Sequence, residues 1–238
     1  MTLAVILAGG YGKRLRPLTQ TTPKPLLKVA GKPIIVHQIS WLKHNGIDEI
    51  VVTVGWLKEK IIAELGSGSR YGVTIVYAVE EEPLGTGGAL YNVRELLSKR
   101  EQFLVVNGDI ITNLDPIPLL EKIAGGRHAV SIAAVELKST YGVLDIDKDG
   151  DLVLSFREKP IIPDYWINAG IYAMTPEALR YMPQKGDMEK TALPKLAQQG
   201  KVVAVRYSLR KVYWRSIDSH KDLEEASREI EEMGGLVK

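Results

Sequence analysis

Apolar residues in the first half of the chain alternate between short continuous runs and helically spaced positions. The continuous runs, which predict buried strands, are residues 3–7, 49–54, 73–79 and 103–106. The helically spaced segments are residues 34–45, 57–65 and 86–97. Strands that are apolar throughout and separated by helices are typical of a mainly parallel sheet with right-handed crossovers.

The pattern changes after residue 128. The predicted strands there are residues 130–135, 143–146, 152–156, 167–173 and 202–207. An Asp-Gly turn at 148–150 predicts a hairpin, and Ser219 with Asp222 predicts a capping box before a last helix near 221–233. We expect one α/β domain over residues 1–238. Its first half, about 1–128, supplies a sheet of the nucleotide-binding type. Its second half, about 129–238, is partly antiparallel and provides a place for a different ligand.

Composition narrows the partners. Thirty-one Lys and Arg against 29 Asp and Glu give a formal charge of +2, so no basic field favours nucleic acid. Cysteine is absent, which excludes disulfides, thiolate zinc sites and a cysteine nucleophile. No apolar run approaches the ~18–20 residues of a membrane span. We expect a cytoplasmic protein without membrane or nucleic-acid partners; a homo-oligomer is compatible with the sequence.

A glycine-rich loop, 7–19, directly follows the first predicted strand and precedes Pro23-Lys24-Pro25-Leu26. Glycines let backbone N–H groups approach a ligand at the carboxyl end of a parallel strand. Lys13, Arg14 and Lys24 add positive charge, so the loop favours a polyphosphate over a simple tight turn. The glycine spacing fits neither the dinucleotide fingerprint nor the P-loop.

Two carboxylates could hold Mg²⁺. Asp109 lies in Asn107-Gly108-Asp109 after the strand at 103–106, and Asp218 precedes the last helix. Mg²⁺ takes a few carboxylates together with phosphate oxygens and water. By itself, Asn107-Gly108-Asp109 is equally typical of a turn without a metal, and Asp218 could be a loop residue with no ligand.

Two stretches of the second half could contact a sugar phosphate. Glu158 can accept hydrogen bonds from sugar hydroxyls, and Lys159 can neutralise a phosphate; Asn168 follows in Asn-Ala-Gly. A solvated, ion-paired edge explains the first pair equally well.

Together these stretches resemble the sugar-nucleotide pyrophosphorylases, or sugar-1-phosphate nucleotidyltransferases, and look most like the short mannose-1-phosphate guanylyltransferase-like forms. Residues 7–26 carry every fixed position of the family pattern L-A-G-G-x-G-x-R-L-x-P-L-T followed by P-K-P-L. Residues 84–88 look like the family's base-binding loop, and the motifs at 107–109, 158–160 and 168–170 follow in order.

The resemblance implies a Rossmann-like nucleotidyltransferase fold and a Mg²⁺-dependent reaction that joins an NTP to a sugar 1-phosphate and releases pyrophosphate. It implies that the catalytic residues are Arg14, Lys24 and Asp109, and that the metal ligands are Asp109 and Asp218. The implied nucleotide-binding residues are Leu7, Ala8, Gly9, Gly10, Gly12, Lys13, Glu80, Gly85, Thr86 and Asn107. The implied sugar-phosphate contacts are Gly142, Glu158, Lys159 and Asn168.

One motif departs from the family. Many members end in W-x-D-I-G-T, with the Asp on the metal. Here Ser216 stands at that Asp position and Asp218 at the Gly position. Family cytidylyltransferases place a metal Asp in a similar M-D-T stretch, so we assign the metal role to Asp218.

Glu80 favours GTP, because one carboxylate accepts both adjacent donors of guanine, N1–H and N2–H₂. With the resemblance, mannose 1-phosphate is the favoured sugar. Two alternatives stay open: a uridylyl- or thymidylyltransferase for glucose 1-phosphate or an amino-sugar 1-phosphate, and a non-catalytic nucleotide-sugar-binding regulator. The regulator is disfavoured because Arg14, Lys24 and Asp109 are intact.

Overall fold

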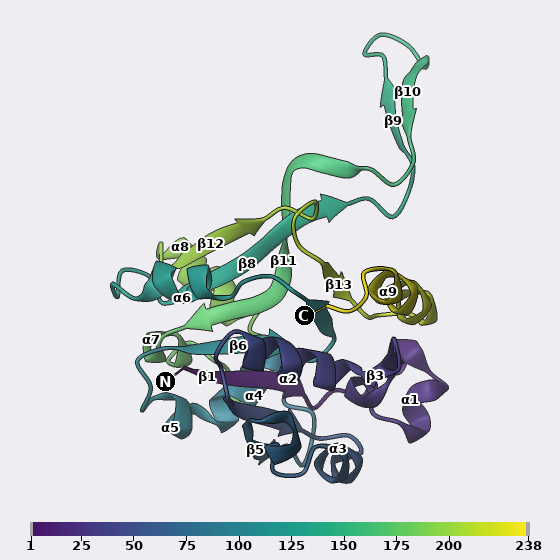
Figure 1. The fold of residues 1–238 in the computed structure, drawn as a ribbon. Coiled ribbons are helices and arrows are strands. Elements are labelled where there is room, and N and C mark those ends of the chain that lie inside the picture. The colour runs from purple at the N-terminus through teal and green to yellow at the C-terminus, as the bar shows by residue number, and fades with distance from the viewer. Residues whose placement is uncertain (1, 237–238) are drawn as a thin grey trace.

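The computed structural model describes residues 2–236, and its centre is a seven-stranded sheet in the order β12-β8-β11-β6-β1-β4-β5 (Figure 1). The strands of this sheet are β1 (Leu3–Ala8), β4 (Glu49–Val54), β5 (Thr74–Val79), β6 (Phe103–Asn107), β8 (Val130–Lys138), β11 (Ile161–Met174) and β12 (Val202–Tyr207). β11 runs antiparallel to both its neighbours, and the other neighbouring pairs are parallel. The expected mixed, mainly parallel α/β sheet is confirmed.

Helices cover both faces of the sheet. Those on one face are α2 (Ile34–His44), α3 (Lys58–Leu65) and α6 (Ile117–Ile123); those on the other are α4 (Gly85–Asn92), α5 (Arg94–Leu97), α7 (Pro176–Leu179) and α8 (Ala192–Gln198). In β1, Ala4 and Ile6 pack against the helices of the first face, and Leu3 and Val5 pack against those of the second. Because both faces are buried, β1 is apolar throughout.

The remaining elements are short or lie at the edges. They are η1 (Lys13–Leu15), α1 (Leu18–Thr21), η2 (Lys24–Leu26), β2 (Lys28–Val29), β3 (Lys32–Pro33), η3 (Ser69–Tyr71), β7 (Ile110–Thr112), β13 (Trp214–Ser216) and α9 (His220–Glu232). β2 pairs with β3 and β7 with β13, each pair antiparallel. The predicted capping box at Ser219 and Asp222 is present at the start of α9. No helix among residues 2–236 is long and apolar enough to cross a membrane.

The predicted helix over 86–97 is wrong as a single element, because it divides at Val93. The N–H of Val93 donates to the carbonyl of Leu90, three residues back, at 3.2 Å. This tighter turn interrupts the i→i+4 ladder of an α-helix. Two short helices, α4 and α5, result.

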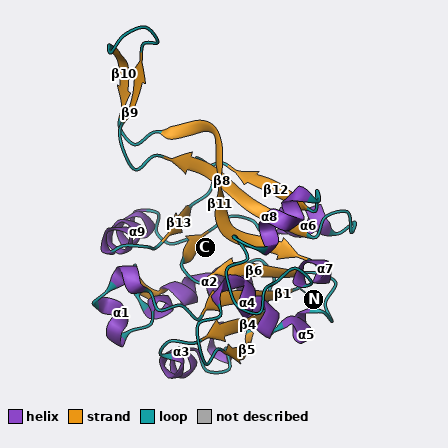
Figure 2. Ribbon diagram, turned by 180° about the vertical axis from the view of Figure 1, so that it is seen from behind, coloured by secondary structure: helices purple, strands orange, loops and turns teal. Residues whose placement is uncertain are grey.

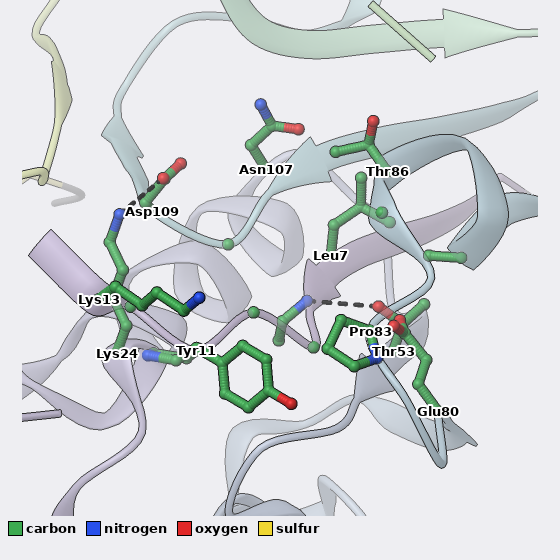
Figure 3. A pocket seen from close by; sticks show the side chains of 18 of the residues that line it. Leu7, Tyr11, Lys13, Lys24, Thr53, Glu80, Pro83, Thr86, Asn107 and Asp109 are labelled. Carbon is green, nitrogen blue, oxygen red and sulfur yellow. Dashed lines mark hydrogen bonds and ion pairs between the residues drawn. The ribbon is translucent and has the colours of Figure 1, made fainter. Parts of the chain in front are cut away.

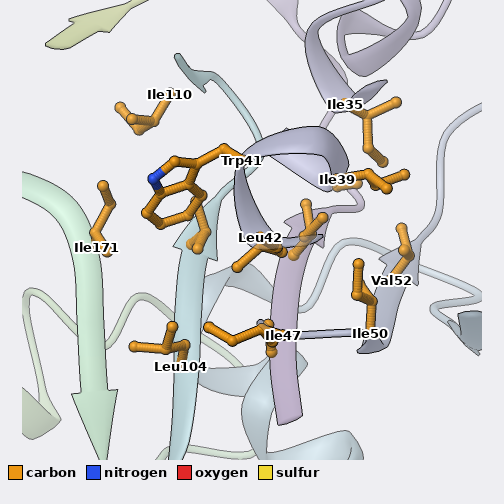
Figure 4. Packing of buried hydrophobic residues seen from close by; sticks show 14 of the residues in the cluster. Ile35, Ile39, Trp41, Leu42, Ile47, Ile50, Val52, Leu104, Ile110 and Ile171 are labelled. Atoms are coloured by element: carbon orange, nitrogen blue, oxygen red, sulfur yellow. The ribbon is translucent and has the colours of Figure 1, made fainter. Parts of the chain in front are cut away.

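The buried face of α2 packs on the sheet, and two of its side chains also hydrogen-bond the backbone that follows β6 (Figure 4). Trp41 is buried and donates from Nε1 to the carbonyl of Leu114 at 2.7 Å. One turn earlier, buried Gln38 donates from Nε2 to the carbonyls of Asn107 at 2.8 Å and Ile110 at 2.9 Å. These bonds fix the turn between β6 and β7, which carries Asp109.

The hairpin predicted around residues 148–150 is confirmed, but it lies outside the central sheet. β9 (Val143–Ile146) and β10 (Val153–Arg157) form a separate two-stranded antiparallel sheet. In both views it projects from the body, beyond the ends of β8 and β11 (Figures 1 and 2). We call residues 139–160 the arm.

Candidate active site

A cleft of about 410 Å³ lies at the carboxyl ends of the parallel strands β1, β4 and β6 (Figure 3). The residues implied for catalysis, nucleotide and metal all line it. They are Leu7, Ala8, Gly9, Gly10, Gly12, Lys13, Arg14, Lys24, Glu80, Gly85, Thr86, Asn107, Asp109 and Asp218. The cleft is also lined by Tyr11, Leu15, Pro25, Pro83 and Gly108, which lie in or next to the motifs above, and by Thr53, Ala89 and Asp187, which no motif indicated.

Glycines allow the loops to meet at this edge. Gly108 donates its N–H to the carbonyl of Leu7 at 3.0 Å, and a Cβ at Gly108 would lie 2.4 Å from that oxygen. Gly12 has φ +60°, and its carbonyl accepts from the Thr19 hydroxyl at 2.9 Å. A Cβ on Gly10, by contrast, would meet no described atom within 4 Å, so this backbone faces open space.

A single ammonium group joins the two predicted metal carboxylates. Nζ of Lys24 lies 2.7 Å from Oδ2 of Asp109 and 3.1 Å from Oδ1 of Asp218. The Lys24 side chain is only 13% exposed, so these ion pairs are poorly screened by solvent. η2 carries Lys24, the β6–β7 turn carries Asp109, and Asp218 follows β13. Segments far apart in sequence therefore converge on one point.

Asp218 is the more heavily engaged carboxylate. Nη2 of Arg14 lies 2.7 Å from its Oδ1, and the Ser216 hydroxyl donates to Oδ2 at 2.9 Å. Burial by itself disfavours ionisation, but the charge of Lys24, together with Ser216 and Arg14, outweighs it and lowers the pKa of Asp218. Asp218 is therefore held as an anion facing the cleft.

The donor set fits a magnesium ion that is completed by substrate. Asp109 and Asp218 converge to within the width of one ammonium group, and both line the cleft. Among residues 2–236 no group of three or more His, Cys, Asp and Glu side chains forms a metal cage. Two carboxylates completed by phosphate oxygens and water are the arrangement that Mg²⁺ prefers.

Glu80 lies behind the glycine-rich loop. It is 6% exposed, and its Oε2 accepts the N–H of Leu84 at 3.2 Å. A Cβ at Gly9 would lie 2.7 Å from Oε1 of Glu80, so only glycine fits there without displacing the carboxylate. Burial raises the pKa of Glu80.

A hydrogen-bonded chain that sequence reasoning missed links the base loop to β11. The Thr86 hydroxyl donates to Oε2 of Glu189 at 2.5 Å, and the Tyr172 hydroxyl donates to Oε1 of Glu189 at 3.3 Å. Nδ2 of Asn168 donates to the Tyr172 oxygen at 2.6 Å. Burial, with Glu189 nearby, raises the pKa of Tyr172, so its hydroxyl stays protonated.

The predicted sugar-phosphate residues do not meet at the cleft. Gly142, Glu158 and Lys159 lie in the arm, where Lys159 pairs with Glu158 at 3.6 Å, and none of the three lines the cleft. The pairing of β11 with β8 shifts register between Ile161 and Trp166, where the chain returns from the arm. Asn168, beyond that shift, is bonded to Tyr172 as described above and does not line the cleft either.

Comparison with known proteins agrees with this geometry. The nucleotidyl transferase family profile matches residues 3–233. The mannose-1-phosphate guanylyltransferase catalytic subunit beta of Danio rerio is 36% identical over 225 residues, which cover 92% of this chain and 62% of that protein. The chain thus spans about three fifths of the length of such curated relatives.

Solved structures match over more of their length. The crystal structure of HddC from Yersinia pseudotuberculosis has a TM-score of 0.76 and 31% identity, covering 96% of this chain and 99% of that one. The same protein complexed with GMP-PN has a TM-score of 0.74 and 29% identity, covering 96% of this chain and 99% of that one. With a family match over nearly its whole length, this chain belongs to the nucleotidyl transferase family.

Proposed function

We propose that this chain transfers a nucleotidyl group from an NTP to a sugar 1-phosphate and releases pyrophosphate, with GTP and mannose 1-phosphate as the favoured pair. The observation that carries the proposal is Lys24, held between Asp109 and Asp218 in a cleft walled by the glycine-rich loop. The relative named a mannose-1-phosphate guanylyltransferase and the HddC complex with GMP-PN support the choice of GTP.

The chemistry requires charge stabilisation more than proton transfer. A phosphate oxygen of the sugar 1-phosphate attacks the α-phosphorus in line; the new P–O bond forms as the bond to pyrophosphate breaks. The nucleophile is already an anion, so no general base is needed. Lys24 and Arg14 instead offset the negative charge that two polyanions bring together. Both cations are pre-positioned by Asp218, at 3.1 Å and 2.7 Å.

Asp109 and Asp218 are the residues that would hold Mg²⁺, which when bound supplies positive charge to the phosphate oxygens. Phosphate oxygens entering the cleft then compete with these carboxylates for Lys24. The open backbone at Gly10 gives a triphosphate room to approach the loop. We assign nucleotide binding to the half at about 1–128 and the sugar phosphate to about 129–238, with residues 1–238 as one domain.

Glu80 is proposed to read the base. Its carboxylate lines the cleft, and one oxygen is already fixed by the N–H of Leu84. A carboxylate only accepts hydrogen bonds, which matches the two adjacent donors of guanine and suits the single N3–H of uracil or thymine less well.

The test is a matrix of GTP, UTP and dTTP against mannose, glucose and amino-sugar 1-phosphates, scored by pyrophosphate release with and without Mg²⁺. We expect the highest kcat/KM for GTP with mannose 1-phosphate, and no release after chelation. Faster turnover of UTP or dTTP would overturn the base assignment. Absence of Mg²⁺-dependent release with every pair, together with tight nucleotide-sugar binding, would replace the enzyme by a regulatory binding protein.

A further inference from the structure

The backbone around Asp218 is anchored on both sides. Before it, the N–H of Ile217 donates to the carbonyl of Asp109 at 2.9 Å, so the segments that carry the two proposed metal carboxylates are joined directly. After it the chain enters α9, and the N–H groups of Asp218 and Ser219 donate to Oδ2 of Asp222 at 3.1 Å and 2.8 Å. The position of Asp218 therefore depends on a side chain that belongs to α9.

Arg215 links this helix cap to the strand that precedes Asp218. Successive side chains of β13 point to opposite faces, so Ser216 reaches Asp218 directly while Arg215 points toward α9. The other oxygen of Asp222, Oδ1, lies 3.6 Å from Nη1 of Arg215. One oxygen of Asp222 thus holds the cap and the other faces a guanidinium, which fixes the orientation of this carboxylate.

Two further carboxylates of α9 hold the Arg215 guanidinium. Its Nη1 lies 2.9 Å from Oε2 of Glu225, and its Nη2 lies 2.9 Å from Oε1 of Glu229. Asp222, Glu225 and Glu229 recur at helical spacing, so their side chains share one face of α9. The Arg215 side chain is 18% exposed, so solvent screens these charges only in part. Arg215 therefore fastens β13 to α9, and without it three like charges would share that face.

The place of Asp218 in the chain explains why its carboxylate needs such support. Ser216, where many family members carry the metal Asp, is the last residue of β13 and pairs with Ile110 of β7. A carboxylate at that position is held by the strand itself. Asp218 lies beyond the strand and directly before Ser219, the N-cap of α9. Its position therefore depends on how α9 is held against β13.

We propose that Arg215 and Asp222 are positioning residues that hold the carboxylate of Asp218 at the cleft. Arg215 fixes α9 and the orientation of Asp222, and Asp222 fixes the backbone of Asp218. The inference rests on the proposed function, in which Asp218 orients Lys24 and Arg14 and holds Mg²⁺. Neither Arg215 nor Asp222 lines the cleft, so both act through Asp218 and not on the substrates.

The experiment measures metal binding without turnover. Mn²⁺ takes the same oxygen ligands as Mg²⁺, and electron paramagnetic resonance follows its binding to the full chain with GTP and no sugar 1-phosphate. Removing an outer partner of a metal ligand typically weakens metal binding by ~10–100-fold, and we expect a loss of that size in Arg215→Met and in Asp222→Ala. Asp222→Glu keeps a capping box and is expected to stay within ~3-fold of the wild-type affinity.

Arg100→Met is the matched control. The Arg100 side chain is 28% exposed and pairs with Glu49 at 2.6 Å, and neither residue lines the cleft. This variant also loses a partly buried guanidinium, so its Tm is expected to fall while its Mn²⁺ affinity stays that of the wild type. Melting curves establish that each variant is folded at the temperature of the binding measurement. Should Arg215→Met not fold, Asp222→Ala against Asp222→Glu makes the same comparison.

Unchanged Mn²⁺ affinity in folded Arg215→Met or Asp222→Ala would overturn the proposal and leave Arg215 as a support of α9 alone. An equal loss of affinity in Arg100→Met, or a wild type that binds no Mn²⁺ in the presence of GTP, would overturn it as well. A wild type that binds Mn²⁺ with GTP but releases no pyrophosphate with any substrate pair would contradict the proposed function instead. The affinities of the variants would still decide the positioning role.

Discussion

The hydroxyl of Ser216 donates a hydrogen bond to Oδ2 of Asp218 at 2.9 Å. Ser216 stands where many sugar-nucleotide pyrophosphorylases carry a metal-binding Asp, and Asp218 stands where they carry Gly. In this chain Ser216 therefore supports the carboxylate of Asp218 by a hydrogen bond. The other oxygen of that carboxylate, Oδ1, faces Lys24 and Arg14. The negative charge is kept at the cleft from a different backbone position.

Removing the charge of Asp218 tests this substitution of positions. Asp218→Asn keeps the shape of the side chain but removes its charge. We expect kcat to fall by roughly 10²–10³ and the Mg²⁺ concentration needed for half-maximal activity to rise. Ser216→Ala removes one hydrogen bond and is expected to cost less than ~10-fold. Mg²⁺ titrations of pyrophosphate release measure both effects.

The matched control for that experiment is the double variant Ser216→Asp with Asp218→Gly, which restores the family arrangement. It should recover part of the lost activity if position 216 can reach the same cation. Near-normal turnover of Asp218→Asn at limiting Mg²⁺ would contradict a role for Asp218 at the metal.

Lys24→Met tests the shared cation, because it keeps an unbranched side chain of nearly the same length and removes its charge. The variant leaves Asp109 and Asp218 facing each other without the ammonium between them. We expect a fall of about 10²–10³ in kcat. Lys58→Met is a suitable control, since its partner Glu81 is exposed and Lys58 does not line the cleft. Comparable losses of kcat in both variants would contradict a specific catalytic role for Lys24.

The nucleotide side of the cleft could be predicted because local signals coincide there. β1, β4 and β6 are buried on both faces, so they appear as continuous apolar runs, and residues directly after such strands meet at one edge. Asp109 directly follows β6, so its position could be read from the strand pattern. Lys24 lies well beyond the end of β1, and its place at the cleft was implied by the Pro-Lys-Pro-Leu motif of the family resemblance. The capping box at Ser219 was equally local.

What could not be predicted depends on packing between distant segments. Glu189 accepts from both Thr86 and Tyr172, and its loop is held against α4 by Gly87 and Gly88, which donate to the carbonyl of Gly186. The segment around Glu189 carries no periodicity that points to the cleft. Glu158 lies in the projecting arm because the chain leaves the central sheet between the end of β8 and the start of β11, a departure that sequence spacing does not report.

Glu80→Gln tests base selection. An amide presents one acceptor and one donor, so it loses the double acceptor that suits guanine and gains a donor for a carbonyl of uracil or thymine. We expect the ratio of kcat/KM for GTP over UTP to fall by about 10-fold or more. Glu81→Gln, at a neighbouring side chain that is 86% exposed and does not line the cleft, should leave the ratio unchanged. An unchanged ratio in Glu80→Gln would assign Glu80 to supporting the loop alone.

The same substitution has an effect on stability that depends on pH. Burial raises the pKa of Glu80 in the folded state above its unfolded value, so the unfolded chain releases this proton first as pH rises. The wild type accordingly loses stability across the interval between the two pKa values, and the penalty is complete above the folded pKa. Below the unfolded pKa both states are protonated and the penalty vanishes. Glu80→Gln is neutral throughout and should escape the penalty.

We therefore expect Glu80→Gln to raise Tm at pH 7–8 and to leave it nearly unchanged close to pH 4. For a chain of this size each kcal/mol of relieved penalty corresponds to roughly 2–4 °C. Calorimetry across this pH range measures the difference, with the exposed Glu81→Gln giving a flat baseline. A Tm difference that is the same at pH 4 and pH 8 would show that the buried carboxylate carries no titration penalty, and that the amide acts only through its hydrogen bonds to Leu84 and Thr53.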